Sequence, residues 1–187
     1  MTAKDEDILT SPSLLKKGLA IDRFVQNIVL NKHINVSSLY SGDKNAILIA
    51  SRINGFGSDY TTKVSCPACA TVAEHTFALD EVETYDGSNF EGHDITATEH
   101  GTFVVKLPRT GFEVEVRLLT SKDENELAAK MQSNKKRAAH ETNLTDQLRK
   151  IIVSVNGIDE LKIINQFIAN LPAFDSRYLR GAYLKVV

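Results

Sequence analysis

Two cysteines, Cys66 and Cys69, stand around a proline in the segment SCPAC and are the only cysteines of the 187-residue chain. A turn with this spacing directs both thiol groups toward one point, and thiolates are preferred ligands of tetrahedral zinc. A structural zinc ion takes four ligands, so the pair is half of such a site. His75 is the nearest of the five histidines and is a candidate third ligand. A Cys-Cys-His-His site would also need His93 or His100.

Two other interpretations of the pair fit the sequence less well. A zinc finger would place two histidines on a following helix at a fixed spacing, and no such helix is predicted here. A redox pair needs the N-terminus of a helix after a buried strand, where the helix dipole lowers a thiol pKa. The flanking residues are instead threonine-rich strand formers. We therefore expect a tight hairpin turn, either inherited from a zinc ribbon or completed by another segment, with zinc as the candidate cofactor.

The segments around the cysteines predict an α+β fold with separate helical and β parts. Apolar residues at helical spacing and cap residues predict helices within 11–30 and 43–55, and strand formers predict a hairpin over 60–78 with the cysteines in its turn. The segment 101–119 predicts a second hairpin, because apolar and charged residues alternate along its second arm. Its buried face is expected to hold Val104, Leu107, Val114, Val116 and Leu118.

Helices are predicted again after the second hairpin. A capping box of Ser121 and Glu124 predicts the start of the first, and further helices are expected over about 144–155, 159–171 and 174–186. The last three hold most of the long aliphatic residues. We therefore expect them to pack on the first two helices as the main core.

The predicted organisation is a flexible tail over 1–11 followed by a single α+β domain over 12–187. Within that domain, 58–119 is expected to be a β-rich insertion between the helical parts 12–56 and 120–187. A chain of 187 residues is long enough for one such domain with its own core.

Composition and charge argue against several classes of function. Apolar residues make up 42% and charged residues 25% of the sequence, as in ordinary globular proteins. The net charge of −2 gives no overall positive field for nucleic acid, and the basic run at 135–137 has acidic neighbours and no interleaved aromatic residues. The polar start MTAKDEDILT is unlike a signal peptide, and no apolar run approaches the roughly 20 residues of a membrane span. We expect a cytosolic protein that binds neither nucleic acid nor membrane.

No pattern for catalysis accompanies the cysteines. The segment NGFGSD lacks the lysine of a phosphate-binding loop, no serine stands in a nucleophile elbow, and Asp and Glu residues form no paired motif. We therefore predict a protein that is not an enzyme and does not bind nucleotides.

Three segments occur in an order that has a known parallel. The first has a Tyr-x-Gly-Asp, a helix ending in Arg-Ile and a glycine, a strand and Cys-Pro-x-Cys. The second is LPRTGFEVEVRLLT, and the third is IIVSVNGIDELKIINQFIANLPAFDSRYLRGAY. The positions of the first are Tyr40, Gly42, Asp43, Arg52, Ile53, Gly57, Tyr60, Cys66, Pro67 and Cys69. In this order the segments, within about 38–187, resemble the T-even-like bacteriophage baseplate hub family.

The resemblance implies a role in assembling the central baseplate hub of a contractile tail, as a hub component or assembly factor without enzymatic activity. The partners would be other hub and tail proteins, and copies of this chain around the three-fold hub axis. The protein would act in the host cytoplasm during assembly and, as a permanent subunit, would stay in the baseplate of the virion. The sequence leaves both roles open. The alternative is a small metal-dependent, zinc-ribbon-like binding module of other function.

The resemblance also bears on the cysteines. Members of the family commonly carry a second Cys-x-x-Cys pair just beyond the terminal helix, which implies a four-thiolate zinc ribbon made from both pairs. The sequence here reaches Val187 without a second pair. We therefore expect an incomplete site at Cys66 and Cys69, and zinc held weakly or not at all by this chain alone.

Overall fold

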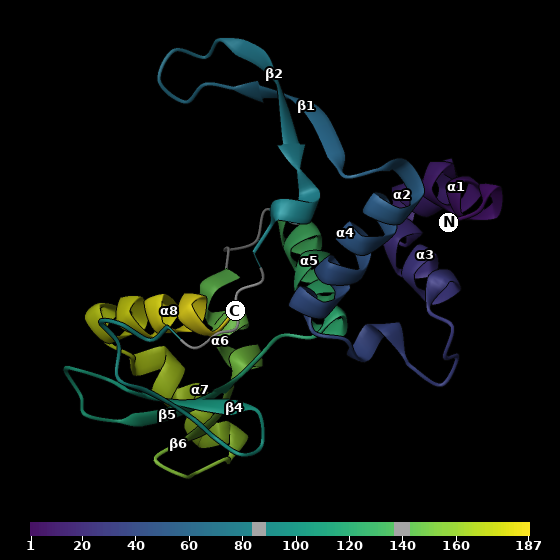
Figure 1. Ribbon diagram of the computed structural model, residues 1–187. Coiled ribbons are helices and arrows are strands. Elements are labelled where there is room, and N and C mark those ends of the chain that lie inside the picture. Colours follow the sequence, from purple (N-terminus) through teal and green to yellow (C-terminus); the bar gives the residue numbers. More distant parts are fainter. Residues whose placement is uncertain (84–88, 137–142) are drawn as a thin grey trace. The chain divides into compact units, whose positions relative to one another are not determined.

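The computed structural model is an α+β protein, which confirms the fold class predicted from the sequence (Figure 1). It describes residues 1–83, 89–136 and 143–187, without the side chains of 134–136. Within these residues there are eight α-helices, a two-stranded sheet and a four-stranded sheet, with helices near both ends of the chain.

The chain divides into two compact units, Met1–Thr84 and Tyr85–Val187. Buried apolar residues form one cluster in each unit. The sequence predicted a single domain with an insertion over 58–119, whereas the division falls inside that segment. The cysteine hairpin belongs to the first unit, and the hairpin predicted over 101–119 belongs to the second.

The first unit is helical apart from one hairpin, and its small core surrounds the buried residues Phe24, Val25 and Val36. Ile8, Ile47 and other half-buried apolar residues pack against this core. The elements are α1 (Ala3–Thr10), α2 (Pro12–Lys17), α3 (Ala20–Ile28), η1 (Val36–Ser38), α4 (Ser41–Phe56), β1 (Asp59–Ser65), β2 (Val72–Ala78) and η2 (Leu79–Glu81).

Two expectations about the start of the chain are wrong. The segment predicted as a flexible tail forms α1, because Asp5 accepts hydrogen bonds from the Thr2 N–H and hydroxyl at the start of the helix. Asp5 is buried and also accepts a hydrogen bond from Asn27 of α3. The helix predicted within 11–30 is divided into α2 and α3 at Gly18, whose φ of +68° favours glycine and ends a helix.

The second unit is a four-stranded antiparallel meander covered by helices. The strand order in the sheet is β3-β4-β5-β6, which is also the order of these strands in the sequence. The core joins Val105, Val114 and Val116 of the sheet to buried residues of the last three helices, such as Ile164 and Leu179. The elements are β3 (Ile95–Ala97), β4 (Thr102–Lys106), β5 (Glu113–Arg117), α5 (Ser121–Lys136), α6 (Asn143–Ile151), β6 (Ile152–Val155), α7 (Leu161–Asn170) and α8 (Ala173–Val186).

The β4–β5 hairpin has one buried and one polar face. Of the five residues predicted to be buried, Leu107, Val114 and Val116 are buried and Leu118 is partly buried against the core. Val104 was assigned to the wrong face: its neighbour Val105 pairs with Val114 in the core, while Val104 pairs with Glu115 on the opposite face. On that face the Glu115 carboxylate accepts hydrogen bonds from the Thr102 and Ser154 hydroxyls, at 2.7 and 2.9 Å.

The C-terminal part departs from the prediction at one strand. The helix expected over 144–155 ends at Ile151, and Ile152–Val155 form β6 beside β5. The main core expected from the C-terminal helices and the first two helices is also wrong, because the buried residues of α6, α7 and α8 cluster with those of the sheet. Among the described residues, no helix is both long and apolar enough to cross a membrane.

Candidate functional site

The cysteines lie in the turn that joins β1 to β2, as the sequence predicts. The Cys66 N–H donates to the Thr71 carbonyl oxygen at 2.9 Å, and the Ala70 N–H donates to the Cys66 carbonyl oxygen at 2.8 Å. Ala70 adopts a φ of +56°, in the left-handed region that a residue with a side chain seldom occupies. Both thiols are free, with Cys66 half-buried and Cys69 exposed. The turn therefore holds two accessible sulfur ligands at one end of the hairpin.

The local hydrogen bonds favour the thiolate form of Cys69. The Cys69 Sγ lies 3.2 Å from the Thr71 hydroxyl oxygen. Hydrogen bonds from the Thr71 hydroxyl, from the Thr71 N–H and from Cys66 lower the pKa of Cys69 below its ordinary value. Because the thiolate is the form that binds metals, the turn is suited to a metal ligand. The pair lies between two strands and not at a helix N-terminus, so the geometry of a thioredoxin-type redox pair is not found here.

The structure does not bring His75 to the cysteines. His75 pairs with Thr62 across the hairpin, four residues before Cys66 on β1. At about 3.3 Å per residue this is about 13 Å along the strand, beyond the reach of a shared metal. The His75 ring instead makes an edge contact with Phe77, with ring centroids 4.5 Å apart.

The other two candidate histidines, His93 and His100, belong to the second unit. The His93 ring packs on that of Tyr178, with centroids 4.7 Å apart, and lies so close to Gly181 that a Cβ there would be 2.9 Å from Nε2. Across the described ranges, no three His, Cys, Asp or Glu side chains are grouped so that they could hold a metal ion. The cysteine turn thus fits zinc in the type of its donors and supplies two of the four.

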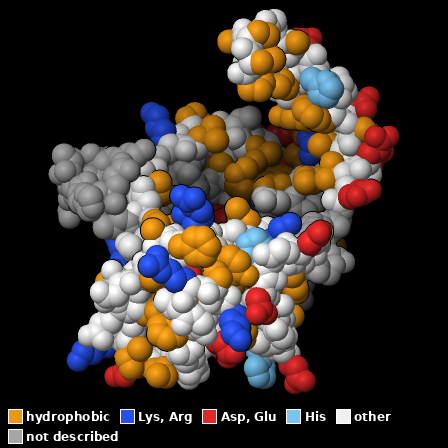
Figure 2. All heavy atoms as spheres, turned by 90° about the vertical axis from the view of Figure 1, so that its left-hand side faces the viewer, with side chains coloured by type: hydrophobic (Ala, Val, Ile, Leu, Met, Phe, Trp, Pro, Cys, Tyr) orange, Lys and Arg blue, Asp and Glu red, His pale blue; other side chains and the backbone are white. Residues whose placement is uncertain are grey.

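The β1–β2 hairpin exposes both of its faces. Strand register places Tyr60 opposite Phe77 and Val64 opposite Ala73 on one face, with the Thr62–His75 pair between them. The other face is mostly polar and carries the pair of Lys63 with Glu74. Tyr60, Val64 and Phe77 are 44%, 41% and 42% exposed, although they are large and apolar. Apolar side chains gather along this hairpin, which is the arm at the top of Figure 2.

The base of this hairpin is fixed to α4 by one side chain. The Arg52 guanidinium donates to the carbonyl oxygens of Gly57 and Asp59, at 2.8 and 3.1 Å. It also lies over the rings of Phe56 and Tyr60, 5.1 and 5.9 Å from their centroids, in cation–π geometry. In Figure 1 the two strands extend from this point away from the helices of the same unit. Arg52 therefore bridges the end of α4 and the start of β1.

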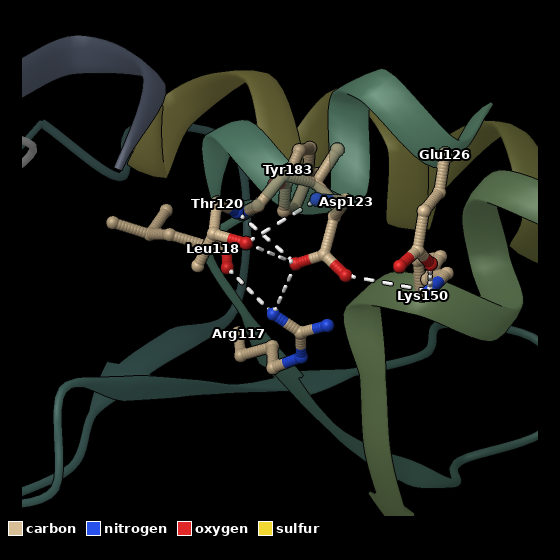
Figure 3. Close-up of polar contacts among 8 residues, drawn as sticks. Arg117, Leu118, Thr120, Asp123, Glu126, Lys150 and Tyr183 are labelled. Carbon is tan, nitrogen blue, oxygen red and sulfur yellow. Dashed lines mark hydrogen bonds and ion pairs between the residues drawn. The ribbon is translucent and has the colours of Figure 1, made fainter. Parts of the chain in front are cut away.

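A second cluster of polar side chains joins the end of β5 to three helices (Figure 3). The Asp123 carboxylate accepts hydrogen bonds from Arg117 and from the Thr120 hydroxyl, both at 2.8 Å, and these bonds hold the pKa of Asp123 well below its ordinary value. Lys150 of α6 forms ion pairs with Asp123 and Glu126. The Tyr183 hydroxyl oxygen accepts the Leu119 N–H at 3.1 Å.

This cluster caps α5 and leaves its carboxylates paired. Thr120 and Asp123 form the helix cap, one residue earlier than the box predicted at Ser121 and Glu124, since the Asp123 N–H also donates to the Thr120 hydroxyl. The Asp123 carboxylate is hydrogen-bonded to Arg117 and Thr120, so its charge stabilises the contact between the end of β5 and the start of α5. We assign it a structural role.

The turn of the motif LPRTG is held in place by a buried carboxylate. Nothing in the sequence indicated this contact. Asp175 of α8 is fully buried and accepts the backbone N–H groups of Arg109 and Thr110, each at 3.0 Å. The partners are 65 and 66 residues apart in the sequence, so no local pattern reveals the contact. Two of the segments that carry the family resemblance are thus joined to each other inside the second unit.

The turn held by Asp175 contributes Thr110 to the lining of an uncharged groove of about 420 Å³. The Thr110 hydroxyl oxygen on its wall is buried and finds no hydrogen-bond partner among the described residues. No signal in the sequence points to this groove, because its lining comes from separate segments: Thr110, Phe112, Val155, Asn156, Ile158, Ile163, Gln166, Phe167, Asn170, Leu171 and Pro172.

Comparisons of the chain with protein-family models, with curated proteins and with solved structures gave no match. The likeness to the baseplate hub family therefore stands on the order of the three sequence segments. Two chemical features of the molecule bear on its function: the pair of free thiols, and the apolar side chains exposed along the hairpin that carries them.

Proposed function

We propose that the protein is a non-enzymatic structural or assembly component of the baseplate hub of a contractile phage tail, and that it acts through protein–protein contacts. The observation that carries this proposal is the β1–β2 hairpin, whose large apolar side chains are exposed on an arm fixed at its base. The order of the three sequence segments supports the choice of the hub family.

An exposed hairpin of this kind is suited to binding another protein. Aromatic and apolar side chains on one face supply the area that a partner can remove from water, and Tyr60 and Phe77 are adjacent there. In the described part of the chain the sheet has only two strands, so each strand has one edge without a strand neighbour. A partner can therefore pack on the apolar face or add a strand at an edge.

The partners we propose are other hub and tail proteins, with copies of this chain around the three-fold hub axis as a further contact. The protein would meet them in the host cytoplasm while the baseplate assembles. A permanent subunit would remain in the virion, and an assembly factor would leave. Mass spectrometry of purified virions separates these two roles, since peptides of an assembly factor would be missing.

The contact surface is tested by co-expressing the chain with the hub proteins encoded beside it and purifying the complex. Phe77→Ser and Val64→Ser remove apolar area from the proposed face, and Val72→Ser is the matched control because Val72 is exposed on the opposite face. We expect the first two variants to retain less hub partner and the control to retain the same amount. Equal retention by all three, or no hub partner with the unchanged chain, would overturn the proposal.

A second candidate is a small metal-dependent binding module of other function, and the cysteine turn is the observation that favours it. Such a module would lose its binding partner when both cysteines are replaced by serine. The hub proposal expects binding through the apolar face of the β1–β2 hairpin. The two candidates therefore differ in which variants should lose the binding partner.

A further inference from the structure

The cysteine turn supplies two sulfur donors, and the described residues group no further ligand with them. Structural zinc is bound by four ligands, and Cys66 and Cys69 provide two. His75 lies on the strand away from the turn, and the described residues offer no third ligand grouped with the two sulfurs. If zinc binds here, the two remaining ligands would come from outside this unit.

The end of the hairpin is built so that a second, identical end can approach it. The ten residues VSCPACATVA, 64–73, contain no Asp, Glu, Lys or Arg, so two copies meet there without repulsion between like charges. The side chains beside the cysteines are small, with Ala68 and Ala70 both exposed. The nearest charged residues, Lys63 and Glu74, oppose each other across the strands, so they add no net charge.

Exposed apolar residues border the cysteines on both sides. Val64 is 41% exposed and Val72 is 58% exposed, and they lie on opposite faces of the hairpin just below the turn. A second hairpin end lying on either face of the first would cover the valine on that face. This burial and the neutral sequence favour a second copy over a charged partner.

We propose that one zinc ion joins two copies of this chain at their hairpin ends, with Cys66 and Cys69 of each copy forming a tetrahedral four-thiolate site. Four cysteine thiols release their protons to solvent, four zinc–sulfur bonds of about 2.3 Å form, and the water ligands of the ion leave. The thiolates and the ion together carry two negative charges. The Thr71 hydroxyl oxygen lies 3.2 Å from the Cys69 sulfur, within hydrogen-bond reach of it in each copy.

The zinc-joined pair is a two-fold assembly and goes beyond the proposed hub role. Each hairpin end binds zinc together with only one other hairpin end. Three copies around an axis therefore cannot all be joined to one another in this way. The zinc-joined dimer is therefore a state of the protein that is not part of a three-fold ring. Its test uses the purified chain alone, so a negative result would leave the hub proposal as it stands, and failure to bind hub proteins would leave the zinc site as it stands.

The test measures mass and metal together. The full chain, reduced and stripped of metal, is titrated with zinc and followed by sedimentation velocity and native mass spectrometry. We expect the sedimenting mass to double, with one zinc per two chains. Cobalt in place of zinc should give the thiolate-to-metal absorption and the intense visible bands of a tetrahedral sulfur site.

Three variants complete the test. Cys66→Ser with Cys69→Ser should lose both the metal and the doubling of mass, while its melting temperature without metal stays that of the unchanged chain. His75→Ala should keep both, since His75 is not a ligand in the proposed site, and Val72→Asp should weaken the pairing by placing like charges together. Zinc bound at one per chain by a monomer, a pair that persists without zinc or without the cysteines, or no retained metal would each overturn the proposal.

Discussion

The two hairpins of this chain are built from similar strands and differ in what covers them. In β4–β5 every position that points toward the helices is apolar, and Val116 is fully buried. In β1–β2 the corresponding face alternates apolar residues with Thr62 and His75, and Val64 is 41% exposed. The comparison shows that strand-forming residues make a hairpin, whereas continuous apolar character on one face makes it part of a core.

The largest effect should come from charging the buried hairpin. Val116→Lys places an ammonium group in the core of the second unit, and we expect it to lower the free energy of unfolding by about 3–5 kcal/mol. The matched change Val64→Lys on the exposed hairpin should cost less than about 0.5 kcal/mol. Urea unfolding of both variants measures the difference. Similar losses would show that the two hairpins are equally buried.

The next largest effect on stability should come from removing the carboxylate that holds the β4–β5 turn. The β4–β5 turn depends on Asp175, which accepts two backbone N–H groups from inside the unit. Asp175→Ala leaves both donors without a partner and should cost about 2–4 kcal/mol. Asp175→Asn keeps one carbonyl oxygen as an acceptor and should cost less. Thermal unfolding of the pair checks this, and an Asn variant as unstable as the Ala variant would contradict the role assigned to the hydrogen bonds.

A smaller effect should depend on pH, through the cluster that follows β5. The hydrogen bond from Arg117 holds the pKa of Asp123 below the unfolded value of about 3.9. The stabilisation is therefore fully present above that value and is lost as pH falls through the folded pKa. Asp123→Asn should cost about 1–2 kcal/mol near pH 7, because the Arg117 side chain is partly exposed. The gap between the variant and the unchanged protein should narrow as pH falls below 4, and a gap that widens would contradict the assignment.

The smallest effect on stability should come from the cysteines themselves. With metal removed, Cys66→Ser and Cys69→Ser should change the free energy of unfolding by less than about 0.5 kcal/mol, since the turn is closed by main-chain hydrogen bonds. At concentrations where the chain is a monomer, two thiolates should lose zinc to a mild chelator. Elemental analysis after dialysis measures this. One zinc per monomeric chain would mean that another ligand completes the shell.

Sequence reasoning found both hairpins because their patterns are local. The turn at Cys66–Cys69 and the alternation along β5 each span a few residues, and both elements are present. The face of β4 was ambiguous because Val104 and Val105 are adjacent and equally apolar. The hydrogen bond from the Leu107 N–H to the Phe112 carbonyl oxygen closes the turn and fixes the register that buries Val105.

Other features could not be predicted because they depend on distant residues. Ile152–Val155 continues the helical spacing of Leu148 and Ile151, and only pairing with β5 makes it a strand. Asp5 and Asp175 carry no local signal of burial, yet both are buried, and each accepts hydrogen bonds from a partner far along the chain: Asn27 for Asp5, and the backbone of 109–110 for Asp175. The cysteine pair itself was predicted, and its separation from His75 follows from the strand between them.

The order of the strands in the second unit has a consequence for synthesis. β5 ends at Arg117, but its neighbour β6 begins only at Ile152, after α5 and α6. A nascent chain that has emerged only as far as β5 therefore presents a strand edge with open N–H and C=O groups and an uncovered apolar face. Such an edge is a binding site for chaperones or for the same edge of another nascent chain until translation delivers β6. We therefore expect the chain to be prone to aggregation during the interval between the synthesis of β5 and that of β6.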